Sequence, residues 1–282
     1  MKKRQLITLI LTVIFVVCCI VVFSRLIQYR SATKENAEAQ SYITPVEPPV
    51  PPAPTPKPTE APEEEPPEEP VEEAEPKDQM LDDETARILR GINYTALKAI
   101  NEDVMGWIVI PGTEVNYPLM QGEDNDFYLD HTWEKNYNSA GSVFLETRCA
   151  SDLSDFNTII YGHRMKNRSM FGCLKDYSDI SYWEEHPYVY VGTTEMLYKY
   201  EIYAAFEPPV TQLPYRLFIK DDGLKQQFLD YSLSETVIDT GIVPTIDTRV
   251  LTMSTCTGHG YATRWVVQAA LVNETPVQVS PD

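Results

Sequence analysis

The sequence predicts a mainly β domain, built as a closed barrel or a sandwich, behind an N-terminal membrane helix. Three observations support this prediction. Short β-type runs bounded by Gly, Pro, Asn and Asp recur after Gly106. Helical periodicity is confined to a few short segments. A long uncharged apolar run opens the chain, and a segment rich in Pro and Glu separates it from the remainder.

The apolar run at Leu6–Phe23 carries no charge and follows Lys2, Lys3 and Arg4. With its flanks it is long enough for one membrane helix of ~20 residues. It is longer than the ~7–15-residue core of a signal peptide and no small-x-small cleavage site follows, so an uncleaved anchor is favoured over a cleaved signal. The leading basic residues predict a cytoplasmic N-terminus. Residues 1–30 are thus the cytoplasmic tip and anchor, with the bulk of the chain outside the cell.

Residues 31–79 are predicted to form an extended linker rich in Pro and Glu. Within it, Pro45–Pro76 holds thirteen prolines and ten glutamates. Such a composition cannot bury a core and favours polyproline-like chain. At ~3.1 Å per residue this stretch reaches at most ~100 Å. It is therefore interpreted as a tether for a domain that works away from the membrane surface.

Residues 80–275 have globular composition, and 276–282 form a short tail. Apolar residues at helical spacing predict one or two helices over Leu81–Asn101, interrupted at Gly91. Eight β-type runs follow, which favours a barrel or sandwich over a parallel α/β sheet. The predicted strands are Trp107–Ile110, Val115–Gln121, Gly141–Glu146, Thr158–His163, Tyr188–Val191, Leu197–Phe206, Arg249–Cys256 and Arg264–Val272.

Two helical segments interrupt the predicted strands. Met170–Tyr177 is a short helix, and Leu217–Leu233 is a longer one between the sixth and seventh strands. The apolar stripe of the longer segment is interpreted as packing against the domain.

Charge and cysteine content exclude several function classes. The net charge of −19 argues against nucleic acid as a partner and against membrane binding through charge. Cys149, Cys173 and Cys256 lie in the globular part, and their odd number leaves at least one free thiol within a single chain. The sequence has no C-x-x-C pair, and its four histidines lack metal-ligand spacing. Neither a metal nor a cofactor is predicted.

Three residues at strand ends suggest thiol acyl transfer. Cys256 ends one predicted strand, Arg264 opens the next, and His163 ends an earlier one. A cysteine reacts as the thiolate, an imidazole moves the proton, and a guanidinium stabilises the oxyanion. The pattern alone leaves the alternatives open, because a free cysteine can be a small core residue and a lone histidine can be structural.

Three further residues near Cys256 are candidates for a role in substrate binding or as the base. Ser254 and Thr255 are candidates for lining a substrate groove, although alternation along the strand points one of them into the domain. His259 lies three residues after Cys256, and its Gly-His-Gly context is read as an exposed turn. His163 is therefore preferred as the base.

The motifs resemble those of class B sortases, the cysteine transpeptidases of Gram-positive cell surfaces. The nucleophile element is Thr252-Met-Ser-Thr-Cys256, the histidine lies in Tyr161-Gly-His163, and Arg264 opens the following strand. The extension that runs from His163 through Gly172 to Tyr177, and the helical insertion, resemble class B in particular. An acidic residue just after the cysteine, present in some class B members, is absent here.

The resemblance implies an eight-stranded sortase-type β-barrel with N-terminal helices and a helix between strands six and seven. It also implies a transpeptidase that cleaves a C-terminal sorting motif of secreted proteins through a thioacyl enzyme. Cys256 is the expected nucleophile, His163 the general acid/base, and Arg264 the residue that holds the oxyanion or substrate. The expected acceptor is an amine of the peptidoglycan cross-bridge, from either a glycine bridge or diaminopimelate.

Two alternatives remain at this point. A cysteine peptidase with the same residue order would only hydrolyse its substrate. A non-catalytic adhesion or scaffold module would be consistent with the anchor and linker equally well. Peptide turnover and its dependence on Cys256 distinguish these classes.

Overall fold

The computed structural model describes residues 3–44, 84–258 and 260–277. Three sequence expectations lie outside this part of the chain: residues 45–79 of the linker, His259, and residues 278–282 of the tail.

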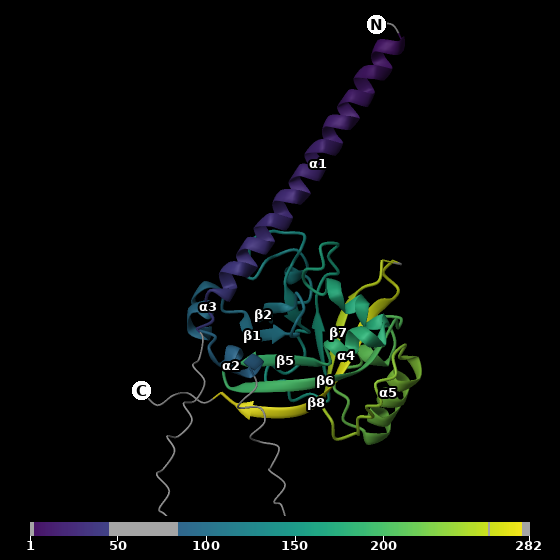
Figure 1. The fold of residues 1–282 in the computed structure, drawn as a ribbon. Coiled ribbons are helices and arrows are strands. Elements are labelled where there is room, and N and C mark those ends of the chain that lie inside the picture. The colour runs from purple at the N-terminus through teal and green to yellow at the C-terminus, as the bar shows by residue number, and fades with distance from the viewer. Residues whose placement is uncertain (1–2, 45–83, 259, 278–282) are drawn as a thin grey trace, which may run out of the picture.

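Eight strands close into a barrel in the order β1-β2-β3-β4-β7-β8-β6-β5 (Figure 1). This closure confirms the predicted mainly β fold and decides for the barrel over the sandwich. A closed sheet leaves no unpaired edge for another chain to join. The strands are β1 (Val104–Val109), β2 (Asn116–Met120), β3 (Val143–Leu145), β4 (Asn157–Tyr161), β5 (Tyr188–Thr193), β6 (Met196–Phe206), β7 (Val250–Cys256) and β8 (Arg264–Pro276).

Two parallel pairings decide which strand ends meet. β2 is parallel to β3, and β4 is parallel to β7, whereas the other neighbouring strands are antiparallel. Parallel strands end at the same side of a sheet. The C-terminal ends of β4 and β7 therefore lie together at one end of the barrel.

Three apolar clusters hold the helices to the barrel. The first fills the barrel and continues to the 3-10 helix η2 (Gly172–Ser178). The second lies where α1 (Lys3–Gln40), α2 (Glu84–Arg90) and α3 (Tyr94–Ile100) cover β1 and β2, and it includes the fully buried Trp107. The third lies between α5 (Asp222–Glu235) and strands β6, β7 and β8, around Phe228 and Leu229. These helices thus bury apolar residues against the barrel, as a packed two-layer domain requires.

The predicted N-terminal helices are present and break at the predicted residue. α2 (Glu84–Arg90) and α3 (Tyr94–Ile100) flank Gly91, and the Asn93 side chain caps α3 by accepting from Ala96 N–H. A side chain at Gly91 would place its Cβ 1.9 Å from the carbonyl oxygen of Thr44. Glycine is required here because two backbone segments touch.

The helical insertion is present between β6 and β7, but its first turn differs from the prediction. α5 spans Asp222–Glu235, not Leu217–Leu233, because Asp221 caps it by accepting from the backbone N–H of Leu224. Likewise, the segment predicted as Met170–Tyr177 is η2 (Gly172–Ser178). Met170 has a φ of 55°, which excludes it from a right-handed helix.

α1 (Lys3–Gln40) is one continuous helix (Figure 1). Its apolar part has a mean hydropathy of 3.1 and is long enough to cross a membrane. Its last turns pack on the barrel, where Ala32 and Ala39 are buried. The helix therefore continues past residue 31, where the linker was expected to begin. Residues 31–40 contain no Pro or Gly and consist largely of good helix formers, which explains the difference.

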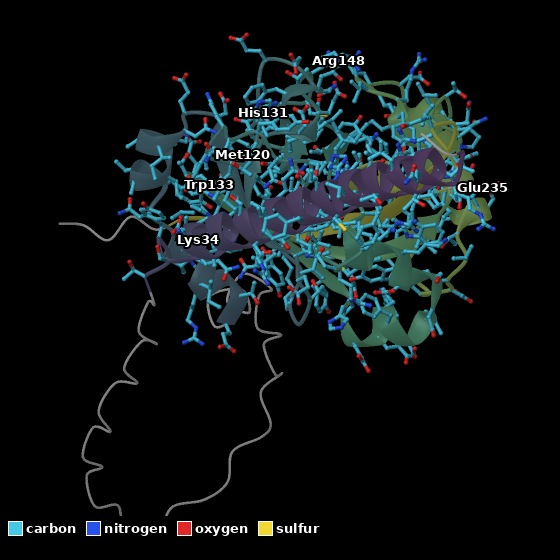
Figure 2. The ribbon with its side chains drawn as sticks, turned by 90° about the horizontal axis from the view of Figure 1, so that it is seen from above. Lys34, Met120, His131, Trp133, Arg148 and Glu235 are labelled. Atoms are coloured by element: carbon cyan, nitrogen blue, oxygen red, sulfur yellow. The ribbon has the colours of Figure 1, made fainter. Side chains whose placement is uncertain are left out.

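Hydrogen bonds fasten this end of α1 to the barrel loops. The indole Nε1 of Trp133 donates to the carbonyl oxygen of Glu35 at 3.0 Å, and the Asn138 side chain donates to the carbonyl oxygen of Gln28 at 2.8 Å. Figure 2 shows Trp133 beside α1, close to Lys34. The exposed apolar part of α1 and the docked part thus belong to one continuous helix.

Candidate active site

Three strand ends meet at one end of the barrel. Cys256 is the last residue of β7, and its direct partner in the register is Arg264, the first residue of β8. Opposed residues of an antiparallel pair project to the same face. The parallel register pairs Tyr161 of β4 with Ser254 of β7, and its continuation sets His163 level with Cys256. The structure therefore brings the three predicted residues together.

A backbone carbonyl orients the His163 ring. Nε2 of His163 lies 2.6 Å from the carbonyl oxygen of Leu129. Because a carbonyl only accepts, Nε2 carries the proton of the neutral ring and Nδ1 is left free to accept one. The hydrogen bond with Cys256 is the main cause that raises the pKa of His163, while burial and the charge of Arg264 oppose it.

The surroundings of Cys256 favour its thiolate. Its pKa is lowered, first because the hydrogen bond with His163 stabilises the thiolate. Burial opposes this effect, and the positive charges of Arg264 and Arg164 add to it. Thiolate is the nucleophilic form of cysteine. The sulfur is also only partly buried, so a substrate carbonyl has access to it.

Arg264 is held in place by the loop that joins β7 and β8. Its Nη1 donates to the carbonyl oxygen of Tyr261 at 2.9 Å and to that of Thr263 at 3.0 Å. These bonds hold the guanidinium beside the thiol before any substrate arrives. Donors fixed in advance stabilise a developing oxyanion without having to reorganise.

The three residues open into one groove with a volume of about 530 Å³. Ser254 and Thr255 both belong to its lining, together with Phe144 and Tyr161. Their side chains differ in direction, because successive strand residues face opposite sides. The Ser254 hydroxyl lies 2.8 Å from the Tyr215 hydroxyl, whereas that of Thr255 is buried without a hydrogen-bond partner among the described residues.

Comparison with known proteins decides the family. The family model of the sortase domain matches residues 108–272. The chain is 32% identical to sortase B of Staphylococcus aureus over 163 residues, which is 58% of this chain and 67% of the relative. It is 33% identical to sortase B of Listeria monocytogenes over 180 residues, 63% of this chain and 73% of the relative.

The chain belongs to the sortase family. Solved structures agree with this assignment. The 2.0 Å crystal structure of S. aureus sortase B superimposes with a TM-score of 0.61 at 30% identity, covering 66% of this chain and 88% of that one. A sortase B–substrate complex from the same organism gives 0.60 at 31% identity, covering 64% and 84%. The resemblance to class B and the enzyme class, a sortase-type cysteine transpeptidase, are therefore confirmed.

A buried carboxylate that the sequence did not single out lies in the wall of the sortase groove. Glu146 directly follows β3 and is 2% exposed. Its Oε2 accepts from Asn125 Nδ2 at 2.7 Å and from the Tyr161 hydroxyl at 3.1 Å, and its Oε1 accepts from Arg148 Nε at 2.8 Å. Burial acts to raise the pKa of Glu146, but these hydrogen bonds together outweigh it and lower the pKa.

These bonds connect the two chain segments that position His163. Tyr161 lies two residues before His163, and Asn125 lies four residues before Leu129, whose carbonyl holds the His163 ring. Glu146 therefore ties together both segments that set the position of the imidazole. From sequence, the position of Glu146 at the end of a predicted strand was visible, but its partners are distant along the chain.

The remaining cysteines of the barrel are not competing nucleophiles. Cys149 and Cys173 are free and buried. Burial raises the pKa of both thiols, that of Cys149 to about 11. Burial thus favours the protonated form of both thiols, whereas the pKa of Cys256 is lowered.

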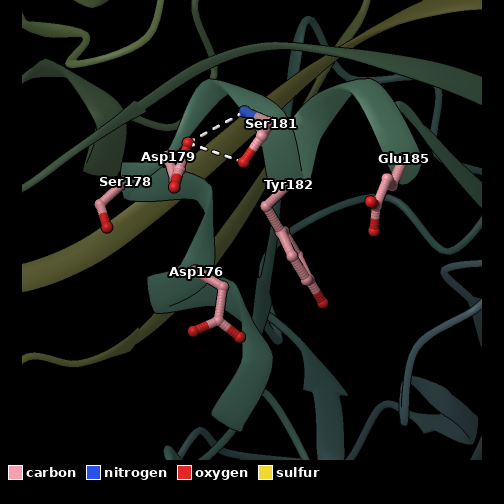
Figure 3. Close-up of a pocket in the computed structure, with 6 residues that line it drawn as sticks. All are labelled: Asp176, Ser178, Asp179, Ser181, Tyr182 and Glu185. Atoms are coloured by element: carbon pink, nitrogen blue, oxygen red, sulfur yellow. Dashed lines mark hydrogen bonds between the residues drawn. The ribbon is translucent and has the colours of Figure 1, made fainter.

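A second depression lies around η2 and α4 (Ile180–Glu185) (Figure 3). It has acidic and hydroxyl side chains, and none of them lines the groove. Asp179 faces it and caps α4 by accepting from the backbone N–H and hydroxyl of Ser181. Asp179 and Ser181 thus form the N-terminal cap of α4. Among the described residues, no cluster of His, Cys, Asp or Glu could hold a metal ion.

Proposed function

We propose that this sortase is anchored in the cell membrane and attaches secreted proteins to the cell wall. It cleaves a C-terminal sorting motif and transfers the new acyl end to an amine of the peptidoglycan cross-bridge. One observation carries the proposal: Cys256, His163 and Arg264 converge in a groove large enough for an extended peptide.

In the first half-reaction, the Cys256 sulfur attacks the carbonyl carbon of a threonine in the motif, and Nδ1 of His163 takes the thiol proton. Arg264 holds the oxyanion of the tetrahedral intermediate. Collapse breaks the C–N bond, and His163 returns the proton to the departing amine. The product is a thioester between Cys256 and the shortened protein.

In the second half-reaction, the cross-bridge amine attacks the thioester carbonyl. His163 accepts the amine proton, the C–S bond breaks, and the proton passes to the Cys256 sulfur. One amide bond is broken and one is made, so the exchange needs no energy source. Ser254 and Thr255 line the groove on the donor side.

For localisation, the proposal is a single pass through the membrane by α1, with a cytoplasmic N-terminus and the barrel outside the cell. Lys2, Lys3 and Arg4 precede the apolar run, in agreement with the excess of positive charge on the cytoplasmic side. The acidic barrel has no charge-based attraction to an anionic membrane.

The proposal is tested with a library of peptides and the full chain in detergent. Products are identified by mass, with and without an amine acceptor. An amine-linked product supports a transpeptidase, whereas free acid alone supports the peptidase alternative. Turnover that is unaffected by Cys256→Ala would contradict a role for this thiol, whereas no turnover of any peptide by the wild type would favour a non-catalytic module.

A further inference from the structure

A second guanidinium lies beside the nucleophile. Arg164 directly follows His163, and its side chain reaches the β7–β8 loop. A Cβ built at Gly258 would lie 2.5 Å from Nη2 of Arg164, so the guanidinium lies directly against this residue, two positions after Cys256. Its charge is among those that favour the Cys256 thiolate.

Within the described residues, Arg164 has no acid in ion-pair distance and its guanidinium makes no hydrogen bond. The neighbouring cation is Lys175, whose Nζ lies 3.4 Å from the centre of the Trp265 ring. Glu207 is the acid that faces Lys175, and it also accepts from the Thr263 hydroxyl. A partly buried guanidinium with no anion of its own is suited to bind one from a ligand.

Arg164 lies outside the donor groove. The groove lining includes Arg264 and His163 but neither Arg164 nor Lys175. Once the donor peptide occupies the groove, the incoming amine must still reach both the thioester and His163, which takes its proton. Arg164 is next to His163 along the chain and its guanidinium lies against Gly258, two residues after Cys256, so its charge lies near both groups that the acceptor must reach.

We propose that Arg164 binds a carboxylate carried by the acceptor next to its attacking amine. Such an acceptor has the chemistry of an amino acid end, as in the side-chain amine of diaminopimelate, whereas a glycine bridge has an amide at that position. This inference rests on the proposed transpeptidation and specifies its second substrate. The bond changes are those of aminolysis, with Arg164 only holding the carboxylate.

The test uses the full chain in detergent, a cleavable sorting peptide, and two acceptors in competition: diaminopimelic acid and its diamide. Both amide products arise from the same thioester, so any effect of a variant on acylation cancels in their ratio. The ratio is compared between wild type and variants, which also cancels the different basicity of the two amines. Arg164→Ala is expected to lower the acid-to-diamide ratio about tenfold, the effect of one charge-assisted hydrogen bond.

Arg164→Lys should keep part of the preference, because the charge remains and the forked donor is lost. Arg168→Ala is the matched control, since Arg168 lies in the same loop and pairs with Asp176. An unchanged ratio in Arg164→Ala would overturn the inference while leaving transpeptidation intact. If wild type gave no amide product with either acceptor, or with triglycine, the proposed function itself would fail.

Discussion

At the scale of single residues, the hydrogen bond between the thiol and the imidazole lowers the pKa of Cys256 and raises that of His163. Both shifts favour the charged pair, while burial of each group favours the neutral forms. Arg264 stabilises the thiolate but opposes the imidazolium, so its net effect on the pair is smaller than its effect on either partner. Its fixed position suits it better to the oxyanion than to activation of the thiol.

A first prediction concerns the pH at which Cys256 reacts. Because its folded pKa is lowered, alkylation by iodoacetamide should begin to rise at a lower pH than for a free cysteine, with its pKa of ~8.5. His163→Gln removes the main cause of the shift, so the alkylation midpoint should move to higher pH. The rate is measured by site-resolved mass spectrometry across pH.

His186→Gln is the control, because His186 contacts the carbonyl of Pro111 and not the thiol. Its alkylation profile should match wild type. Equal midpoints in wild type and His163→Gln would show that the imidazole does not stabilise the thiolate.

The three proposed catalytic residues could be singled out from sequence for a specific reason. Cys256 and Arg264 lie at strand ends, whereas β4 ends at Tyr161 and His163 follows it by two residues instead of ending the strand as predicted. All three belong to local motifs, so short stretches of sequence reveal them. The hydrogen-bond partners of Glu146, and the approach of Arg164 to Gly258, exist only because the fold brings distant segments close. No local pattern marks such residues, because their environment is set by pairing between distant segments.

At the scale of elements, Glu146 links the end of β3 to β4 and to the segment before η1 (Phe127–Leu129). We predict that Glu146→Gln lowers the free energy of unfolding by about 1–3 kcal/mol. The donors around Glu146 use both of its carboxylate oxygens, and the glutamine amide offers only one acceptor oxygen. The KM for the sorting peptide should rise several-fold as Tyr161 and Asn125 lose their fixed positions in the groove. Urea unfolding and steady-state kinetics measure the two effects.

The matched control for this prediction is Glu123→Gln, a change at an exposed position. It should leave stability and KM within error of wild type. A Glu146→Gln variant with unchanged stability and KM would show that the hydrogen bonds of Glu146 do not shape the groove.

Strand positions were predictable because apolar β-type runs alternate with turn residues, and all eight occur where expected. The start of α5 could not be predicted from the apolar pattern. The apolar stripe extends back to Leu217, whereas the N-cap at Asp221 sets the first residue of the helix. Capping chemistry and hydrophobic pattern thus disagreed, and the capping residue determined the boundary. The order in which the strands pair in the barrel could not be predicted from the apolar pattern either, because it depends on contacts between strands that are distant in sequence.

At the scale of the whole molecule, α1 reaches the barrel directly. Ile43 forms an antiparallel bridge with Ile92, and Thr44 N–H donates to the carbonyl oxygen of Gly91 at 2.8 Å. The chain on either side of residues 45–83 therefore meets at the barrel. The distance between the apolar helix and the catalytic groove is set by the docked part of α1, and not by the length of the Pro/Glu-rich segment as expected from sequence.

We predict that Ala39→Asp in the full chain weakens this docking, because Ala39 is fully buried in the cluster beneath α1 and a carboxylate there has no partner. The melting temperature in detergent should fall by several degrees and the fluorescence of Trp133 should shift to longer wavelength. Ala37→Asp, an exposed position two residues away on the same helix, should change neither. Identical effects of the two substitutions would contradict a docked α1.

The most direct measurement of the central claim is the intact mass of the full chain after incubation with a sorting peptide and no amine. Wild type should gain the mass of the N-terminal peptide fragment, and hydroxylamine should remove it as expected for a thioester. The adduct should map to Cys256 and be absent from Cys256→Ala. An adduct that persists in Cys256→Ala, or cleavage of the peptide by that variant at the wild-type rate, would contradict the account.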